Sequence, residues 1–212
     1  MPTGIRVHLQ IVLPSLPTTA APGGRAWRTS VSDGYAGGGL AGVHVAGTAP
    51  PGEPMTPLTE AVVRRWAAAG VAPRPGLADA DLDAFEARHG VRLPAAARGL
   101  YRRADGMPPG AWDEHLIAFW PLAEVGPVPV LLAGCRGIPD YGGIETALPD
   151  AGAYYLFADH SIWLTVYAAR LVPEPDAPAP VVCIRGGGDW AVVAPSFQDF
   201  LRRYADDPWD IF

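Results

Sequence analysis

The stretch from Leu82 to Gly106, LDAFEARHGVRLPAAARGLYRRADG, constrains the fold more than any other part of the chain. Its apolar residues fall at helical spacing on both sides of Gly90, which predicts two short helices joined there. Gly90 stands where a left-handed C-terminal cap is expected, and Pro94 occupies the favoured first position of the second helix. Asp105 and Gly106 form the turn that ends it. We expect this helical pair to support the sheet formed by the rest of the chain.

Two further helices are predicted, one on each side of this stretch. The first is capped by Thr56 and closed by Gly70. The last is capped by Ser196 in an acidic variant of the capping box. Its apolar residues follow the spacing i, i+3, i+4, i+7: Phe197, Phe200, Leu201 and Tyr204.

The segments between the helices alternate short apolar runs with turn residues, which is typical of antiparallel strands. A strand is expected at 116–120 and a single helical turn at 122–125, with loops at 134–152 and 172–180. One hairpin is expected from 154–158 and 162–167 across Asp159-His160-Ser161, and another from 181–185 and 190–193 over a glycine-rich loop. The predicted class is α+β: N-terminal helices packed on a mainly antiparallel sheet of hairpins, with a closing C-terminal helix.

The first 54 residues differ in composition from the rest. They show no sustained helical or strand periodicity and are rich in glycine, proline, serine and threonine, so we expect mostly disorder. Alternatively, Met55 is the true start and residues 1–54 come from a mis-called reading frame. A signal peptide is the weaker interpretation, because His8, Gln10 and Pro14 interrupt the apolar run. Residues 55–212 are expected to form a single domain.

Charge and cysteine content narrow the function classes. The chain carries a net charge of −6 without any lysine, which disfavours direct binding to nucleic acid. Residues 55–212 hold thirteen arginines against twenty acidic residues, a net charge of −7 that either steers a basic partner or keeps the protein soluble. Two cysteines and no apolar run of about 20 residues favour a cytoplasmic protein without a membrane span.

The helical pair and the last helix together resemble the SUKH superfamily, which includes bacterial toxin-immunity proteins and a fungal regulator of cell-wall synthesis. The resemblance covers about 77–204 and is carried by these residues: Leu82, Phe85, Glu86, Gly90, Leu93, Pro94, Leu100, Tyr101, Asp105, Gly106, and Ala194 to Leu201. It departs from the family in the long loop at 135–152, in the proline-rich insertion at 173–180 and in residues 1–54. The resemblance implies an α+β domain that binds other proteins and has no catalytic residues to carry over.

Several groups of polar residues are candidates for a metal, catalytic or phosphate-binding site. His115, Asp159 and His160 lack the spacing of a compact metal site. Asp159-His160-Ser161 invites comparison with a catalytic triad, but adjacent residues in a hairpin turn should diverge. The run 185–189 joins two expected strands and so lacks the strand-to-helix context of a phosphate loop. We therefore expect no cofactor, no metal and no enzyme activity, and rank an enzyme built around these residues lowest.

Helix residues Glu86 and His89 are expected to have local roles. The carboxylate should pair with backbone or with Arg88, Arg92 or Arg98, and the imidazole should be a cation stabilised by the helix dipole.

Loop residues near the sheet ends are the better candidates for partner contacts. Aromatic anchors are available in Trp112, Tyr141, Trp163 and Trp190, although these could equally be core. The predicted partner-binding residues are Asp140, Tyr141, Asp159, Asp189 and Trp190. The leading hypothesis is an immunity protein that occludes a basic toxin domain, such as a nuclease. The alternative is an intracellular regulatory or scaffold module.

Overall fold

The computed structural model describes residues 57–175 and 177–212. The expectations for residues 1–54 and for the Thr56 cap lie outside the described residues.

Four helices of eight residues or more form where the sequence predicts them. They are α1 (Pro57–Ala68), α2 (Asp79–His89), α3 (Ala95–Arg103) and α6 (Phe197–Asp206). Gly90 ends α2 in the left-handed conformation, with φ of 65°. Ser196 caps α6 by accepting a 3.0 Å hydrogen bond from the Asp199 backbone N–H. Both capping predictions are confirmed.

The ends of α3 differ from the prediction by one or two residues. Pro94 is the N-cap residue in extended backbone rather than the first helical residue. At the other end, Ala104 is already extended, because it forms an isolated antiparallel bridge with Pro75. Tertiary pairing therefore ends this helix before the Asp105-Gly106 turn.

A mostly antiparallel sheet confirms the α+β class, with strand order β1-β3-β4-β5-β6 and β2 also paired with β3. The strands are β1 (Ile117–Phe119), β2 (Gly126–Pro127), β3 (Tyr154–His160), β4 (Thr165–Arg170), β5 (Val181–Ile184) and β6 (Trp190–Ala194). The hairpin of β5 and β6 closes over the glycine-rich loop as predicted, and residues 172–180 form an irregular connection.

The predicted position of the β3–β4 turn is wrong. β3 continues through Asp159 to His160, because β1 pairs with it there, with Ile117 opposite His160. The turn therefore begins at Ser161, and β4 starts only at Thr165. The alternating apolar residues at 162–164 belong to an exposed turn and not to a strand.

The expectation of a plain loop at 134–152 is also wrong. This segment contains α5 (Ile144–Ala147) and η2 (Ala151–Ala153). It follows α4 (Val128–Leu131), and the expected single turn is η1 (Leu122–Glu124). Ile144 and Leu148 are buried, so the segment contributes to the core. A further short helix, η3 (Pro208–Ile211), follows α6.

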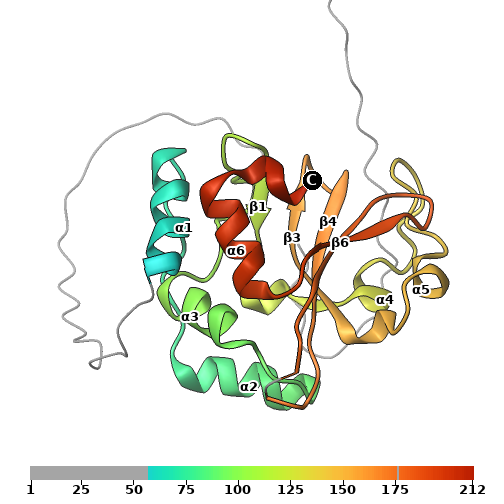
Figure 1. Cartoon of the computed structure of the whole chain (residues 1–212), viewed down its shortest axis with the longest axis horizontal. Coiled ribbons are helices and arrows are strands. Elements are labelled where there is room, and N and C mark those ends of the chain that lie inside the picture. The colour runs from blue at the N-terminus through green and yellow to red at the C-terminus, as the bar shows by residue number, and fades with distance from the viewer. Residues whose placement is uncertain (1–56, 176) are drawn as a thin grey trace, which may run out of the picture. The chain divides into compact units, whose positions relative to one another are not determined.

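Each face of the sheet has its own hydrophobic core. Figure 1 shows α1, α2, α3 and α6 grouped on one side and α4 and α5 on the other. Phe157 and Tyr167 join the core under the long helices, whereas Leu156 and Val166 join the core under α4 and α5. Strand alternation thus divides neighbouring residues between two cores, and both faces of the central strands are buried.

Candidate functional site

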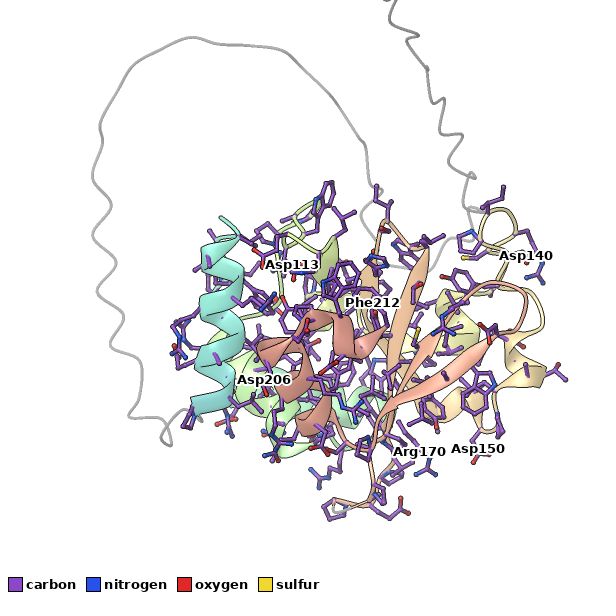
Figure 2. The ribbon with its side chains drawn as sticks, turned by 45° about the horizontal axis from the view of Figure 1, so that its top comes forward. Asp113, Asp140, Asp150, Arg170, Asp206 and Phe212 are labelled. Carbon is purple, nitrogen blue, oxygen red and sulfur yellow. The ribbon has the colours of Figure 1, made fainter. Side chains whose placement is uncertain are left out.

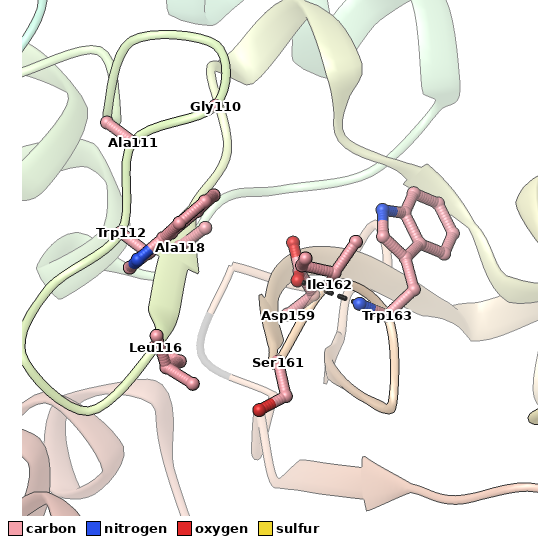
Figure 3. A pocket seen from close by; sticks show the side chains of 9 residues that line it. All are labelled: Gly110, Ala111, Trp112, Leu116, Ala118, Asp159, Ser161, Ile162 and Trp163. Carbon is pink, nitrogen blue, oxygen red and sulfur yellow. Dashed lines mark hydrogen bonds between the residues drawn. The ribbon is translucent and has the colours of Figure 1, made fainter. Parts of the chain in front are cut away.

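A cavity of about 270 Å³ opens between the loop that precedes β1 and the β3–β4 turn. We call it the tryptophan groove and define it by these lining residues: Trp112, Leu116, Ala118, Asp159, Ser161, Ile162 and Trp163. Figure 3 shows Trp112 and Leu116 on one side, Ile162 and Trp163 on the other, and Asp159 between them. The groove is therefore mainly apolar with one carboxylate.

Large apolar side chains are exposed on both sides of the groove. Trp112 is 43% exposed and Ile162 is 66% exposed, and Leu116 and Trp163 also belong to the exposed class. Isolated exposed apolar residues are ordinary, but a group that rims one cavity marks an interaction site. The groove is the part of the described surface where such residues converge on a cavity.

The backbone around the groove is strained. Leu116, Ser161, Ile162 and Trp163 have φ between 53° and 66°, the left-handed region. For residues with a β-carbon this conformation costs about 1–2 kcal/mol each. Among residues 57–175 and 177–212, only Asp150 is a further non-glycine residue of this kind. Strain of this type is concentrated at binding and active sites, where it positions side chains.

Hydrogen bonds tie the two sides of the groove together. The Ser161 N–H donates to the Leu116 carbonyl over 2.9 Å, joining turn to loop. Beneath the loop, the Asp113 carboxylate accepts a 2.6 Å hydrogen bond from the Tyr204 hydroxyl and a 3.0 Å bond from the Ile117 N–H. The loop is thereby anchored to α6, and the groove is held open by buried bonds.

Asp159 supplies the only carboxylate that lines the groove. It lies in strand β3 rather than in the predicted turn, and it is 6% exposed. Its carboxylate accepts a 2.7 Å bond from the Trp120 indole N–H and a 3.0 Å bond from the Trp163 backbone N–H. Burial raises the pKa of Asp159, and these two bonds do not offset it. The Trp120 and Trp163 rings stack at 4.7 Å beside it.

The neighbouring residues do not assemble a triad. The Ser161 hydroxyl and the His160 Nε2 lie 3.3 Å apart, so these two adjacent residues do contact each other, contrary to expectation. The Asp159 side chain is engaged by the two tryptophans instead, so no series from carboxylate to imidazole to hydroxyl forms. Burial lowers the pKa of His160, whose ring packs against Phe212.

The other histidine considered for a metal site packs elsewhere. His115 lies edge-on to Trp209 and close to Glu114, which pairs with Arg65. In the described part of the chain, no group of three histidine, cysteine, aspartate or glutamate residues could hold a metal ion.

The predicted partner-binding residues are distributed over two places. Besides Asp159 in the groove, Tyr141 is only 3% exposed, and its hydroxyl donates to the Trp163 carbonyl over 2.7 Å. Asp140 is exposed, and its carbonyl accepts a 2.7 Å bond from the Gly187 N–H. Figure 2 shows it well apart from Asp113, which lies beneath the groove loop.

The remaining two predicted residues, Asp189 and Trp190, lie in the β5–β6 hairpin. Asp189 is exposed and pairs with Arg185 at 3.1 Å, and the half-buried Trp190 donates its indole N–H to the Ala147 carbonyl. Contact between any of the five predicted residues and a partner stays a prediction.

Glu86 has the local role that was predicted. Its carboxylate accepts bonds of 2.9 Å from the Leu93 N–H, from Arg92 and from Arg98. Desolvation raises the pKa of Glu86, but these three donors outweigh it and lower the pKa overall. Glu86 thus joins α2 to α3.

The surroundings of His89 disfavour the predicted cation. Burial and the neighbouring Arg88 lower the pKa of His89, and its ring packs at 4.5 Å from Phe85. The half-buried ring packs as an aromatic side chain against Phe85 and Tyr155 at the end of α2.

Sequence reasoning missed Leu116 and Ile162 as site residues. Both were assigned to strands because their apolar character fitted a period of two. The sequence signal that could have found Ile162 is the run Ser161 to Leu164. In it, large apolar residues follow the polar pair Asp159-His160 without an intervening glycine or proline. Trp112 and Trp163 were recognised as aromatic anchors, but not as facing members of one groove.

No helix in the described ranges is long and apolar enough to cross a membrane. A search of curated proteins finds no match to the chain. A family model described as SMI1 / KNR4 family (SUKH-1) matches residues 76–203, from the residue before Leu77 to the last turn of α6. This match spans more than half of the chain and includes both the helical pair and the sheet. The chain belongs to the SMI1/KNR4 family (SUKH-1).

Proposed function

We propose that this protein is a non-enzymatic, cytoplasmic immunity protein that neutralises a cognate bacterial toxin by direct binding. Immunity proteins are one functional class within its family, which supports this choice. The observation that carries the proposal is the tryptophan groove. Its exposed apolar rim, held in strained backbone, is the kind of surface that binds another protein.

The chemistry of the groove favours binding over catalysis. Asp159 is the one carboxylate that lines it, and no histidine or cysteine of the described chain lines the groove beside it. The cysteine thiols lie elsewhere, and burial raises the pKa of both Cys135 and Cys183, which disfavours reactive thiolates. The groove thus offers shape, aromatic surface and negative charge.

Charge favours a basic partner. The net charge of −7 over residues 55–212 produces a negative field that would steer a positively charged toxin domain and speed its encounter. A nuclease domain fits this description, because it must itself bind phosphate. In this account the immunity protein covers the basic surface of the toxin with the groove and its surroundings.

Co-expression with the toxin encoded beside this gene tests the proposal. The intact protein should co-purify with the toxin and restore growth of the producing cells. Ile162→Lys should abolish both, because it removes an apolar contact at the groove rim and places a positive charge against the basic partner. Trp209→Ala is a matched control, since Trp209 is 66% exposed but lies outside the groove. Failure to bind or protect against any neighbouring toxin would refute the immunity role.

The family match also favours a second candidate, an intracellular regulatory or scaffold module. The same groove would then bind a resident partner instead of a toxin. Gene neighbourhood separates the two, because an immunity gene should stand beside the gene of a large secreted toxin. Capture of a resident protein that depends on Ile162, without toxin protection, would favour this second role.

A further inference from the structure

Four carboxylates are buried in the described part of the chain, and three of them are well compensated. Glu86 and Asp105 each pair with an arginine, and Asp113 accepts three hydrogen bonds. Among the described residues, Asp159 differs from Glu86 and Asp105 because no arginine lies within ion-pair distance of it, and from Asp113 because it accepts two hydrogen bonds instead of three. It is also the one that lines a cavity open to solvent.

An ionised carboxylate has room for further donors. Each oxygen of Asp159 accepts one printed bond, whereas a carboxylate offers about four acceptor positions in all. The Asp159 carboxylate is therefore available to a donor that enters through the groove. A cation there would also offset the unfavourable burial of the negative charge.

Resting on the proposed function, we infer that the tryptophan groove takes an arginine side chain of the partner, with its guanidinium against Asp159 and its flat face against the indoles of Trp112 and Trp163. Arginine fits better than lysine, because the guanidinium is planar, stacks on aromatic rings, is weakly hydrated and presents several donors at once. The aliphatic part of the side chain would lie against Leu116 and Ile162.

The size of the cavity agrees with a single side chain. Its volume of about 270 Å³ lies just below the range of roughly 300–1,000 Å³ that holds small-molecule ligands. An arginine inserted between two tryptophans and paired with a buried carboxylate would have the features of an interface hot spot.

The test uses the full chain with its tryptophan indole N–H groups labelled for NMR. N-acetyl-L-arginine methylamide is titrated into the millimolar range, and N-acetyl-L-citrulline methylamide serves as the neutral probe of the same shape. Arginine should shift the Trp112 and Trp163 signals in a saturable way, and citrulline should bind at least about tenfold more weakly, a difference of about 1.4 kcal/mol.

Two variants and one control separate binding from folding. Asp159→Asn should abolish the difference between the two probes, although it also alters two buried hydrogen bonds. Trp112→Ala changes an exposed residue, so the fold should persist, and affinity for the arginine probe should fall about threefold, as expected for a lost cation–π contact. Trp209→Ala should leave the affinity unchanged.

Absence of a saturable shift, equal shifts with arginine and citrulline, or equal effects of Trp112→Ala and Trp209→Ala would each overturn the inference. These outcomes are independent of the toxin assay. A protein that protects against its toxin but ignores arginine would retain the proposed function and lose this inference. A protein that binds arginine but no toxin would lose the proposed function and retain the arginine site.

Discussion

The α2–α3 corner, defined as residues 82–106 and so including the turn after α3, and the tryptophan groove use the same structural features in opposite ways. Each contains a buried carboxylate and residues in the left-handed conformation. In the corner, Glu86 is neutralised by two arginines of its own chain, and glycines at 90 and 106 adopt the left-handed backbone. In the groove, Asp159 has only neutral partners, and Leu116 and Ile162 adopt that backbone despite their side chains.

This difference is the basis for proposing that the corner serves stability and the groove serves contact. Glycine adopts positive φ without steric cost, so the corner is close to its least strained state. Bulky residues at positive φ reduce stability, and they persist where their side chains serve another purpose. The family-matching residues Glu86, Gly90 and Gly106 therefore have structural roles, and we propose that the strained residues mark the partner-binding surface.

The largest expected effect is a loss of stability in the α2–α3 corner. Gly106→Ala should destabilise the protein by about 2–5 kcal/mol, because it combines a strained φ of 68° with a β-carbon 2.5 Å from the Trp120 backbone. Gly90→Ala is the matched control, since it has φ of 65° but nothing within 4 Å of the new β-carbon. It should cost only about 1–2 kcal/mol. Urea denaturation measures both, and equal losses would contradict the close approach at Gly106.

Removing the corner carboxylate should have the next largest effect. Glu86→Ala leaves the buried Leu93 N–H without its partner, which should cost about 1–3 kcal/mol of unfolding free energy. Arg88→Ala is the control, because Arg88 is exposed on the same helix. Toxin affinity of the folded fraction should not change. A loss of affinity at unchanged stability would instead place Glu86 in the interface.

Relieving backbone strain in the groove should raise the free energy of unfolding, by less than the two substitutions above lower it. Ile162→Gly removes a left-handed cost of about 1–2 kcal/mol and adds a backbone-entropy cost of about 0.5–1 kcal/mol. The variant should thus gain up to about 1.5 kcal/mol in urea denaturation while its toxin affinity falls. Leu164→Gly in the same turn, where φ is not positive, should show no gain. A destabilised Ile162→Gly protein would mean that Ile162 stabilises the fold.

The smallest expected effect is on the pH dependence of stability. Acidification should distinguish Glu86 from Asp159, because their pKa values are shifted in opposite directions. The pKa of Glu86 is lowered by folding, so its contribution to stability is present above the unfolded pKa and is lost as pH falls through the folded pKa. The pKa of Asp159 is raised, so proton uptake on acidification favours the folded state. Glu86→Gln should therefore flatten the acid loss of stability below about pH 5, and Asp159→Asn should steepen it. Parallel pH profiles for the two variants would contradict the opposite shifts.

Much of the fold could be predicted because its signals are local. Phe197, Phe200, Leu201 and Tyr204 follow the helical period, and all four are buried. Gly90 and Ser196 act as caps through short-range geometry that their residue types indicate. The predicted ends of β5 and β6 are nearly right for the same reason, since a glycine-rich run must join them.

The groove could not be predicted because it depends on distant contacts. Asp159 looks like a turn residue, but pairing between β1 and β3 keeps it in a strand. Ile162 and Leu164 look like strand residues, but Ser161 is bonded to Leu116 and the chain turns there. No local period encodes left-handed backbone at Ile162 or the bond between Asp113 and Tyr204. The short helix at 144–147 was missed because its burial comes from packing on the sheet.

The central claim is that the groove, and not the family-defining corner, contacts the partner. Calorimetric titration of the cognate toxin with two charge-changing variants tests it most directly. Ile162→Lys in the groove should weaken binding by about thirtyfold or more, as for a lost hot spot of about 2 kcal/mol. Arg88→Asp on the exposed side of α2 should change the affinity by less than about threefold, as for a rim residue. A large loss with Arg88→Asp and an unchanged affinity with Ile162→Lys would contradict the account.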